Sequence, residues 1–184
     1  YKIQQYKKYT KFDVKIQIPG KRTIIKNIII PLLGLHNVKN ATSALSVAFS
    51  IGVPSKIIKL GLKNFKGVQR RFNYLFDKNN VSFFDDYAHH PTEITSVLDG
   101  VREVYKKKEI VCIFQPHRIS RLKNLKLEFA KSFKKANTII LCPLYKAGES
   151  IKLGFTYKSF AKLIVKNSKV NLIIIKNELE LKKV

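Results

Sequence analysis

Four short polar stretches of the sequence carry the side chains best suited to chemistry. They are Gly34–Ala41, Arg70–Phe72, Asp85–Glu93 and Phe114–Arg121, and they contain imidazole, guanidinium and carboxylate groups. Each stretch follows a predicted strand or opens a predicted helix. Ligands of an open α/β sheet bind beyond the carboxyl ends of its strands, where side chains from separate loops converge. We therefore expect these stretches to form a binding site.

Two adjacent aspartates close one predicted strand. Asp85 and Asp86 follow an apolar run, so one carboxylate can stay in the sheet while the other projects beyond it. A projecting carboxylate could bind Mg²⁺, a ribose hydroxyl or a lysine. The alternative is an Asx-type turn that leads into the next helix. His89 and His90 are neighbours and point to opposite sides of an extended segment, so at most one is expected to face a ligand.

Two arginines open the helix that follows the next predicted strand. Arg118 and Arg121 come after Phe114, at a helix N-terminus where backbone N–H groups also face outward. Guanidinium groups bind carboxylates and phosphates through a planar pair of donors, so this pair suits an anionic ligand. The alternative is a pair of solvated arginines, although cations at this end of a helix oppose its dipole.

Three further parts of the sequence hold candidate residues, some of which have structural alternatives. Arg70 and Arg71 lie at the expected domain junction, where an arginine could reach a nucleotide or form a salt-bridged linker. Asn37 is an expected helix cap, whereas capping does not explain Asn40, whose amide could bind an adenine or ribose edge. The segment Tyr145–Glu149 is a third polar loop after a predicted strand.

Hydrophobic spacing predicts the elements that position these loops. Alternation in residues 12–18 and 24–30 around Pro19-Gly20 predicts a β-hairpin. A helix from Asn37 is expected to end at Gly52, and a second to start at Pro54. From Val81 onward, short apolar runs alternate with amphipathic stretches, which favours βαβ units and a parallel sheet. The expected strands of this sheet are Val81–Asp85, Ile110–Phe114, Thr138–Cys142 and Asn171–Ile175.

Three helices are expected between these strands. Pro91 suits a first helical position, and Glu93 lies near the positive end of the dipole. The third helix is expected to start near Thr156. The apolar stripes of the three helices are Ile94, Val97, Leu98, Val101 and Tyr105 in the first, Leu122, Leu125, Phe129 and Phe133 in the second, and Phe160, Leu163 and Ile164 in the third.

Composition limits the classes of function. The chain has 184 residues and a formal charge of +24, which raises the hypothesis of a basic module that binds nucleic acid. Lysines are scattered over nearly every segment, however, which favours compositional drift over a designed groove. Cys112 and Cys142 lie in apolar runs and are expected to be reduced core thiols of a cytosolic protein. The sequence has no apolar run of the roughly 20 residues that span a bilayer.

Taken together and in this order, the four stretches resemble the Mur ligase family. The resemblance extends from about Gly34 to Glu149, and the stretch Phe114–Arg121 is similar to the members that add L-alanine rather than to the related murein-tripeptide ligases. It implies an α/β fold in two parts. Residues 1–68 would be the C-terminal part of a central ATPase domain, and residues 69–184 a Rossmann-like domain with a mostly parallel sheet that binds the incoming amino acid.

The resemblance also implies a reaction and a set of site residues. ATP and Mg²⁺ would serve as cofactors for joining L-alanine to UDP-N-acetylmuramate through an acyl phosphate, in the bacterial cytoplasm. Asp86, His89 and Arg71 would be catalytic. The residues implied for nucleotide binding are His36, Asn37, Asn40, Arg71 and Asp86, and those implied for substrate binding are Tyr87, His89, His117, Arg118 and Arg121. No residue is expected to ligate a resident metal.

One family signature is absent from these residues. The sequence contains no Gly-x-x-Gly-Lys-Ser/Thr phosphate loop, so we expect a C-terminal piece of a ligase that needs the N-terminal and phosphate-loop portions of the same enzyme as partners. No specific nucleic acid or membrane partner is expected. The alternatives are a related murein-tripeptide ligase, a noncatalytic homologue, and the basic nucleic-acid-binding module.

Overall fold

The computed structural model describes residues 1–6, 8–18, 21–65, 67–68 and 70–181. They form two compact units, one within residues 1–87 with 103–105 and the other made of the remaining described residues from 88 onward. The domain boundary expected between residues 68 and 69 stays a prediction. Among the described residues, no helix is long and apolar enough to cross a membrane. The fold is α/β, as the sequence predicts.

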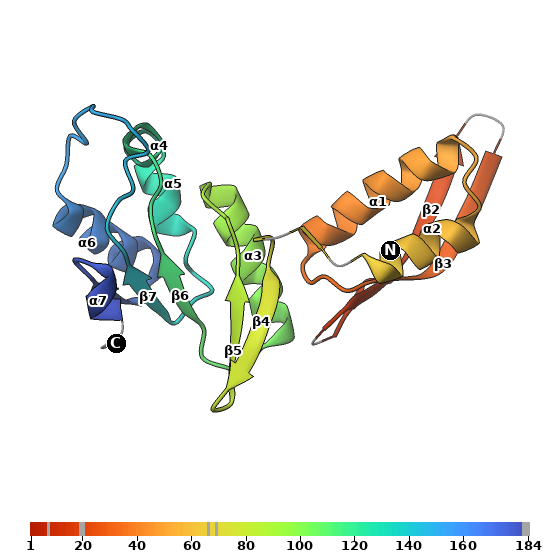
Figure 1. The fold of residues 1–184 in the computed structure, drawn as a ribbon, viewed down its shortest axis with the longest axis horizontal. Helices are drawn as coiled ribbons and strands as arrows, with labels where there is room; N and C mark the ends of the chain where they lie inside the picture. The colour runs from red at the N-terminus through yellow and green to blue at the C-terminus, as the bar shows by residue number, and fades with distance from the viewer. Residues whose placement is uncertain (7, 19–20, 66, 69, 182–184) are drawn as a thin grey trace. The chain divides into compact units, whose positions relative to one another are not determined.

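The first unit begins with an antiparallel sheet covered by two helices (Figure 1). The sheet order is β1-β2-β3, and α1 contacts β2 while α2 contacts β3. The elements are β1 (Gln4–Gln5), β2 (Thr10–Ile18), β3 (Lys21–Ile30), α1 (Leu35–Ser50) and α2 (Ser55–Asn64). The predicted hairpin and both helices are confirmed. The predicted turn at Pro19-Gly20 lies outside the described residues.

A bulge changes which residues of β3 face the core. Phe12 pairs with Ile28 but Val14 pairs with Ile25, so β3 holds one extra residue between these pairs. Asn27 takes a φ of 57° there, and its N–H donates to Oδ1 of the buried Asp13 over 2.8 Å. Ile25 is buried as a result. Ile24, which the simple alternation places with the core residues, is 46% exposed.

Glycines define both ends of α1. Gly34 is its N-cap, with φ 89° and ψ 144°, so the prediction that Asn37 caps this helix was wrong. Asn37 lies inside the first turn. At the other end Gly52 has a φ of 89°, its N–H donates to Phe49 O, and the next N–H donates to Ala48 O, which is the Schellman arrangement.

Two further strands of the first unit form an antiparallel pair of their own. They are β4 (Asn73–Lys78) and β5 (Val81–Asp85), with Asn73 opposite Asp85. The sequence predicted β5 as a strand of the parallel sheet and did not predict β4, so the pairing of β5 was predicted wrongly. Aromatic contacts join the two strands, since the rings of Phe76 and Phe83 stack with centroids 4.6 Å apart. These contacts favour the antiparallel hairpin.

The second unit has a parallel sheet of order β6-β7-β8. Figure 1 labels β6 and β7 of this sheet. Its strands are β6 (Val111–Phe114), β7 (Thr138–Leu141) and β8 (Asn171–Ile174). Its helices are α3 (Pro91–Val104), α4 (Ile119–Asn124), α5 (Lys126–Lys131), α6 (Tyr157–Ser168) and α7 (Glu178–Leu181). The main core includes Phe114, Leu122, Phe129, Phe133, Ile139, Leu141, Phe160 and Ile164.

The predicted helices of this unit are present, but one of them is divided into two shorter helices. The stripe from Leu122 to Phe133 was expected on a single helix, but Leu125 separates α4 from α5. Each helix still buries a stripe residue, Leu122 in α4 and Phe129 in α5, and Phe133 is buried in the turn after α5, each at most 1% exposed. α6 begins near Thr156 as predicted, and Thr156 is its N-cap, whose side chain accepts a hydrogen bond from Ser159 N.

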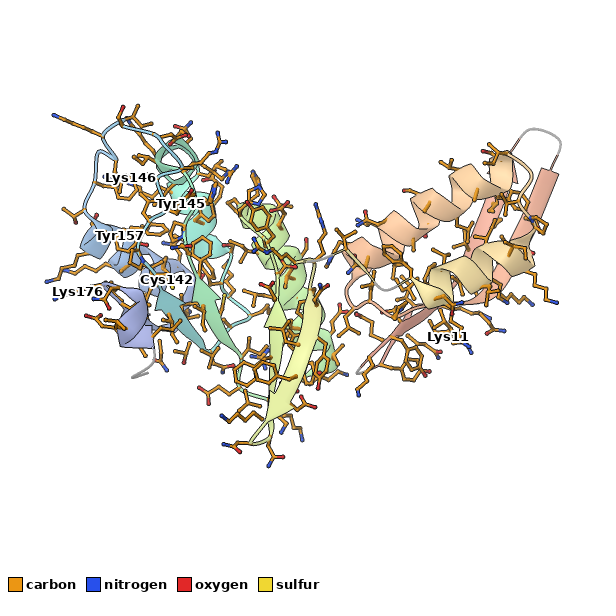
Figure 2. The ribbon with its side chains drawn as sticks, viewed as in Figure 1. Lys11, Cys142, Tyr145, Lys146, Tyr157 and Lys176 are labelled. Carbon is orange, nitrogen blue, oxygen red and sulfur yellow. The ribbon has the colours of Figure 1, made fainter. Side chains whose placement is uncertain are left out.

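The two cysteines are free thiols. Cys142 is buried directly after β7, and Cys112 is half-buried in β6. Burial raises the pKa of the Cys142 thiol. The hydroxyl of Tyr157 donates to the carbonyl of Cys142, so the start of α6 is tied to the end of β7, and Figure 2 labels both residues. The prediction of unlinked thiols is confirmed.

Candidate functional site

The loops after β6 and β7 continue side by side beyond the sheet. Cys142 N donates to Phe114 O and Tyr145 N to Pro116 O, each over 2.9 Å, and Arg118 N donates to Tyr145 O over 2.8 Å. His117 and Tyr145 form an isolated parallel bridge. Figure 2 labels Tyr145 and Lys146 on the loop that follows β7. The sequence predicted that polar loops would follow these strands, and the backbone hydrogen bonds explain how the two loops order each other.

Arg118 lies at the start of α4 in a strained conformation. It is the N-cap residue, with φ 71° and ψ 132°, a region that residues with a side chain rarely adopt. Its own side chain makes no capping hydrogen bond. Glu149 supplies the cap instead, because its carboxylate accepts from Ser120 N over 2.8 Å and from Ser120 Oγ over 2.6 Å. The backbone N–H of Ser120, one of those expected to face outward at this helix N-terminus, is therefore already paired.

The hydrogen bonds around Glu149 also fix its charge. The side-chain bond from Ser120 lowers the pKa of the Glu149 carboxyl most, followed by the backbone bond, and Arg118 adds a smaller electrostatic contribution. Arg121, three residues after Arg118, donates from Nη1 to His117 O over 3.4 Å. Arg118 is exposed and Arg121 is half-buried. Two guanidinium groups are thus held near one short turn of chain.

His117 lies between aromatic and cationic neighbours. Its ring centroid is 5.0 Å from that of Tyr145 and 6.4 Å from that of His89. Burial lowers the pKa of His117, and Arg121, Arg118 and His89 lower it further. These effects favour a neutral imidazole at neutral pH, which can accept as well as donate a hydrogen bond.

The Asp85–Glu93 stretch leads into α3 through a capping arrangement. Glu93 Oε2 accepts from His89 N over 3.0 Å and from His90 N over 3.1 Å. The same oxygen lies 3.6 Å from His89 Nδ1. Pro91 begins the helix and Glu93 lies in its first turn, as predicted. The capping bonds orient the backbone of both histidines.

Asp86 links its own segment to the Arg70–Phe72 turn. Its Oδ2 accepts from Phe72 N over 2.7 Å, and Tyr87 N donates to Arg70 O over 2.7 Å. Arg70 and Phe72 both have positive φ, at 59° and 50°. The Arg70 guanidinium lies 5.9 Å from the centre of the Tyr87 ring. Backbone strain at two residues of one turn is a feature of functional sites as well as of tight turns.

His36 lies in the first turn of α1, within the electrostatic range of this turn. Burial lowers the pKa of His36, Asp86 raises it and Arg71 lowers it, in decreasing order of size. Its Nδ1 atom is buried and has no hydrogen-bond partner among the described residues. Buried polar atoms in native structures are nearly always paired, so an unpaired ring nitrogen marks a position that a ligand or water can satisfy.

Gly34 makes room for this imidazole, which gives a testable prediction. A Cβ at Gly34 would lie 2.8 Å from His36 Cε1 and 2.9 Å from Nδ1. We expect Gly34→Ala to lower the free energy of unfolding by about 2–4 kcal/mol, from backbone strain at φ 89° plus displacement of the ring. Urea denaturation followed by circular dichroism measures the difference.

Gly52→Ala is the matched control for this prediction. Gly52 has the same φ of 89°, but nothing lies within 4 Å of a Cβ placed there. It should therefore lose only the backbone contribution, about 1–2 kcal/mol. Equal losses in the two variants would show that His36 does not depend on the space beside Gly34.

The two asparagines of this helix differ in exposure. Asn37 is buried, and its Nδ2 donates to Leu33 O over 2.8 Å, so it fastens the first turn of α1 to the preceding loop. Asn40 is exposed on the same helix. Their roles toward a nucleotide stay predictions.

The predicted site residues fall into two groups. The first unit contains His36, Asn37, Asn40, Arg71, Asp86 and Tyr87, and the second contains His89, His117, Arg118 and Arg121. Within each group, contacts or electrostatic effects link most members. The prediction that both groups meet in one cleft stays a prediction. No group of metal-ligating side chains occurs among the described residues.

Two residues with clear roles in this site were not among the predicted site residues. Glu149 caps α4, and its sequence signal was only that it lies in a polar loop after a strand. Gln5 accepts from Gly34 N through Oε1 over 2.7 Å, so it fixes the residue before the first turn of α1. Nothing in the local sequence around Gln5 indicates a partner so distant in the chain.

Comparison with known proteins places these residues in a family. Residues 70–179 match the family model described as "Mur ligase, glutamate ligase domain". A UDP-N-acetylmuramate–L-alanine ligase of Pelagibacter ubique is 59% identical over 182 residues, which cover 98% of this chain and 39% of that protein. The corresponding ligase of Bartonella quintana is 45% identical over 148 residues, covering 79% of this chain and 31% of that protein. This chain therefore spans well under half the length of these relatives.

Solved structures show the same fold. The UDP-N-acetylmuramate–alanine ligase of Thermotoga maritima aligns with a TM-score of 0.73 at 26% identity, over 99% of this chain and 38% of that one. The folylpolyglutamate synthase of the same organism aligns with a TM-score of 0.66 at 20% identity, over 99% of this chain and 40% of that one. At that identity the second likeness shows the fold alone.

Proposed function

This chain belongs to the Mur ligase family, and from that premise we propose that it is the C-terminal part of an ATP-dependent ligase that joins L-alanine to UDP-N-acetylmuramate. The observation that carries the proposal is the paired loop after β6, which holds Arg118 and Arg121 near one turn of chain. Two guanidinium groups there suit the carboxylate of an amino acid. The relatives from Pelagibacter ubique and Bartonella quintana are named for L-alanine, which favours that amino acid over those of other family members.

The residues around His36 fit a nucleotide. The buried, unpaired Nδ1 of His36 can pair with a base or ribose group, and Arg71 can offset phosphate charge. We propose that Asn37, Asn40 and Asp86 complete this part of the site. ATP supplies the phosphoryl group that activates the muramoyl carboxylate, and Mg²⁺ neutralises the charge that develops on it. The domain division at residues 68 and 69 belongs to the same proposal.

The residues of the second unit act on the amine. Arg118 and Arg121 bind the carboxylate of L-alanine, which fixes the direction of its amino group. That group attacks the activated carbonyl of the muramoyl acyl phosphate, the C–N bond forms, and phosphate leaves. We propose that the neutral imidazole of His117 accepts a proton from the ammonium group of alanine before the attack, with the neighbouring His89 as a further contact. The contact of Tyr87 with the substrate stays a prediction.

Peptidoglycan precursors of this kind are made from nucleotide-linked sugars, so we place the complete ligase in the bacterial cytoplasm. The free thiols of Cys112 and Cys142 support a reducing compartment. The partners that the proposal requires are UDP-N-acetylmuramate, L-alanine and the nucleotide-binding portions of the same polypeptide.

The test is a ligation assay with the complete ligase. Phosphate release should require ATP, UDP-N-acetylmuramate and L-alanine together, and mass spectrometry should find the muramoyl–alanine amide. As a control, isothermal titration of this chain alone should show weak or no ATP binding, because its sequence has no phosphate loop. Phosphate release that is independent of L-alanine would contradict the proposed substrate, and tight Mg²⁺-dependent ATP binding by this chain alone would contradict its role as a part of the site.

A further inference from the structure

A single carboxylate connects the loop after β7 to the arginine-bearing turn after β6. Both oxygens of Glu149 accept hydrogen bonds from Ser120, one from the backbone N–H and one from the hydroxyl. Glu149 is itself fixed by a tight turn, because its N–H donates to Lys146 O over 3.1 Å and both Ala147 and Gly148 take positive φ. The carboxylate is therefore presented by an ordered loop.

The turn around Arg118 and Ser120 depends on contacts from outside itself to keep its conformation. Arg118 has φ 71° and ψ 132°, and such a conformation persists only when surrounding contacts fix it. One contact is the Arg118 N–H bond to Tyr145 O, and the other is the Glu149 bond pair to Ser120, two residues later. α4 is too short to order this turn by its own propensity, since it spans only Ile119–Asn124. Loss of the Glu149 carboxylate would free the backbone that orients the Arg118 side chain.

Charge gives Glu149 a second effect on the same turn. Arg118 and Arg121 place two cations at the positive end of a helix, which is electrostatically unfavourable. Glu149 brings a negative charge to that end, and the bonds from Ser120 lower its pKa so that it is ionised at neutral pH. The carboxylate thus offsets the charge of the two arginines. Among the described residues neither guanidinium forms an ion pair with it, so both stay available to a ligand.

We propose that Glu149 is a positioning residue for the amino-acid substrate, which holds the Ser120 turn so that Arg118 and Arg121 can receive the substrate carboxylate. This inference rests on the proposed function, because it takes the two arginines as the receptor for L-alanine. Glu149 does not touch the reacting atoms. Its removal should therefore weaken alanine binding and leave the chemical step nearly intact.

The experiment compares variants of the complete ligase in steady-state kinetics. Glu149→Ala should raise KM for L-alanine about 10-fold, change kcat by less than about two-fold, and leave KM for ATP and UDP-N-acetylmuramate within about two-fold. Glu149→Gln keeps one oxygen for the Ser120 N–H and should stay within about three-fold of wild type in KM for L-alanine. Ser120→Thr keeps both donors and should behave in the same way.

Glu180→Ala is the matched control. The Glu180 carboxylate also accepts a backbone N–H, from Lys176 over 2.8 Å, but it lies on α7. Removing it tests the general effect of losing a carboxylate cap, and KM for L-alanine should not change. Thermal denaturation of each variant checks that the fold is intact.

The outcomes separate this inference from the proposed function. Suppose that the wild-type enzyme is active but Glu149→Ala leaves KM for L-alanine unchanged, or raises all three KM values equally. Either result would overturn the positioning role and leave the proposed function standing. A wild-type enzyme without alanine-dependent phosphate release would overturn both. If Glu149→Ala misfolds, Ser120→Ala decides instead, because it removes only the hydroxyl that donates to Glu149 and should raise KM for L-alanine by a smaller factor than about 10-fold. An unchanged KM for L-alanine in a folded Ser120→Ala enzyme would then overturn the role.

Discussion

Arg118→Ala in the complete ligase is expected to lower kcat/KM for L-alanine by about 100-fold. The guanidinium is proposed to pair with the substrate carboxylate, and removing one partner of a hydrogen-bonded charge pair costs about 2–5 kcal/mol. A loss of about 100-fold corresponds to roughly 2.7 kcal/mol, which lies within that range. KM for ATP should stay within about two-fold. Phosphate release measured across alanine concentrations gives these values.

Two variants control for charge and for fold in this experiment. Arg118→Lys keeps the charge but loses the planar pair of donors, so it should recover only part of the activity. Lys123→Ala removes one exposed positive charge from the same helix and should leave kcat/KM for L-alanine unchanged. If Lys123→Ala is as harmful as Arg118→Ala, the effect belongs to the net charge of α4 and not to a specific receptor.

Asp86→Ala is expected to lower kcat/KM for ATP by about 100-fold in the same enzyme. The substitution removes the acceptor of the Phe72 N–H, which lies in the turn that carries Arg71. It also removes a charge that acts on His36. Both effects disturb the groups proposed to bind the nucleotide, and each lost charged hydrogen bond costs about 1.5–3 kcal/mol. Steady-state kinetics at varied ATP concentration measures the change.

Asp86→Asn distinguishes the backbone contact from the charge. The amide keeps an oxygen that can accept from Phe72 N, so the turn should persist and the remaining loss should report on charge alone. Asp99→Asn, on α3, is the matched control and should have no effect on KM for ATP. An Asp86→Ala enzyme with wild-type kinetics would exclude Asp86 from nucleotide binding and leave it a structural residue.

Most elements of this fold follow from local spacing, and the exceptions have identifiable causes. α6 was predicted to start near Thr156 and to bury Phe160, Leu163 and Ile164, because this spacing can be recognised within a few residues of sequence. β4 was missed because its sequence, NYLFDK, mixes polar and charged residues with apolar ones and has no clear alternation. A strand whose side chains are mostly exposed lacks the burial pattern on which such a prediction depends.

Non-local contacts account for the other differences. The exposed position of Ile24 results from one inserted residue in β3, which the hydrogen bond from Asn27 to Asp13 stabilises across the hairpin. The pairing of β5 with β4 depends on aromatic contacts between strands, which spacing along one strand does not reveal. Gly34 rather than Asn37 caps α1 because the loop before the helix requires a left-handed residue.

In the candidate site too, contacts between distant parts of the chain could not be predicted from the sequence. Residue types and strand ends were sufficient to propose Arg118 and one of the two carboxylates Asp85 and Asp86, because these chemistries are recognisable one residue at a time. His36 and His117 were proposed from the resemblance to the family. Glu149 was not selected, because its role depends on a partner in the preceding crossover, Ser120. Supporting residues of this kind become visible only when two loops are seen together.

The bond between Arg118 N and Tyr145 O has a consequence for how the protein folds. The two residues are separated in the chain by α4, α5 and β7, so they can meet only after that whole crossover has closed. Nascent or partly denatured molecules therefore lack an arranged arginine turn even where their helices are already formed. Recovery of the proposed alanine affinity during refolding should lag behind the return of helical signal, so alanine binding can report the closure of this crossover.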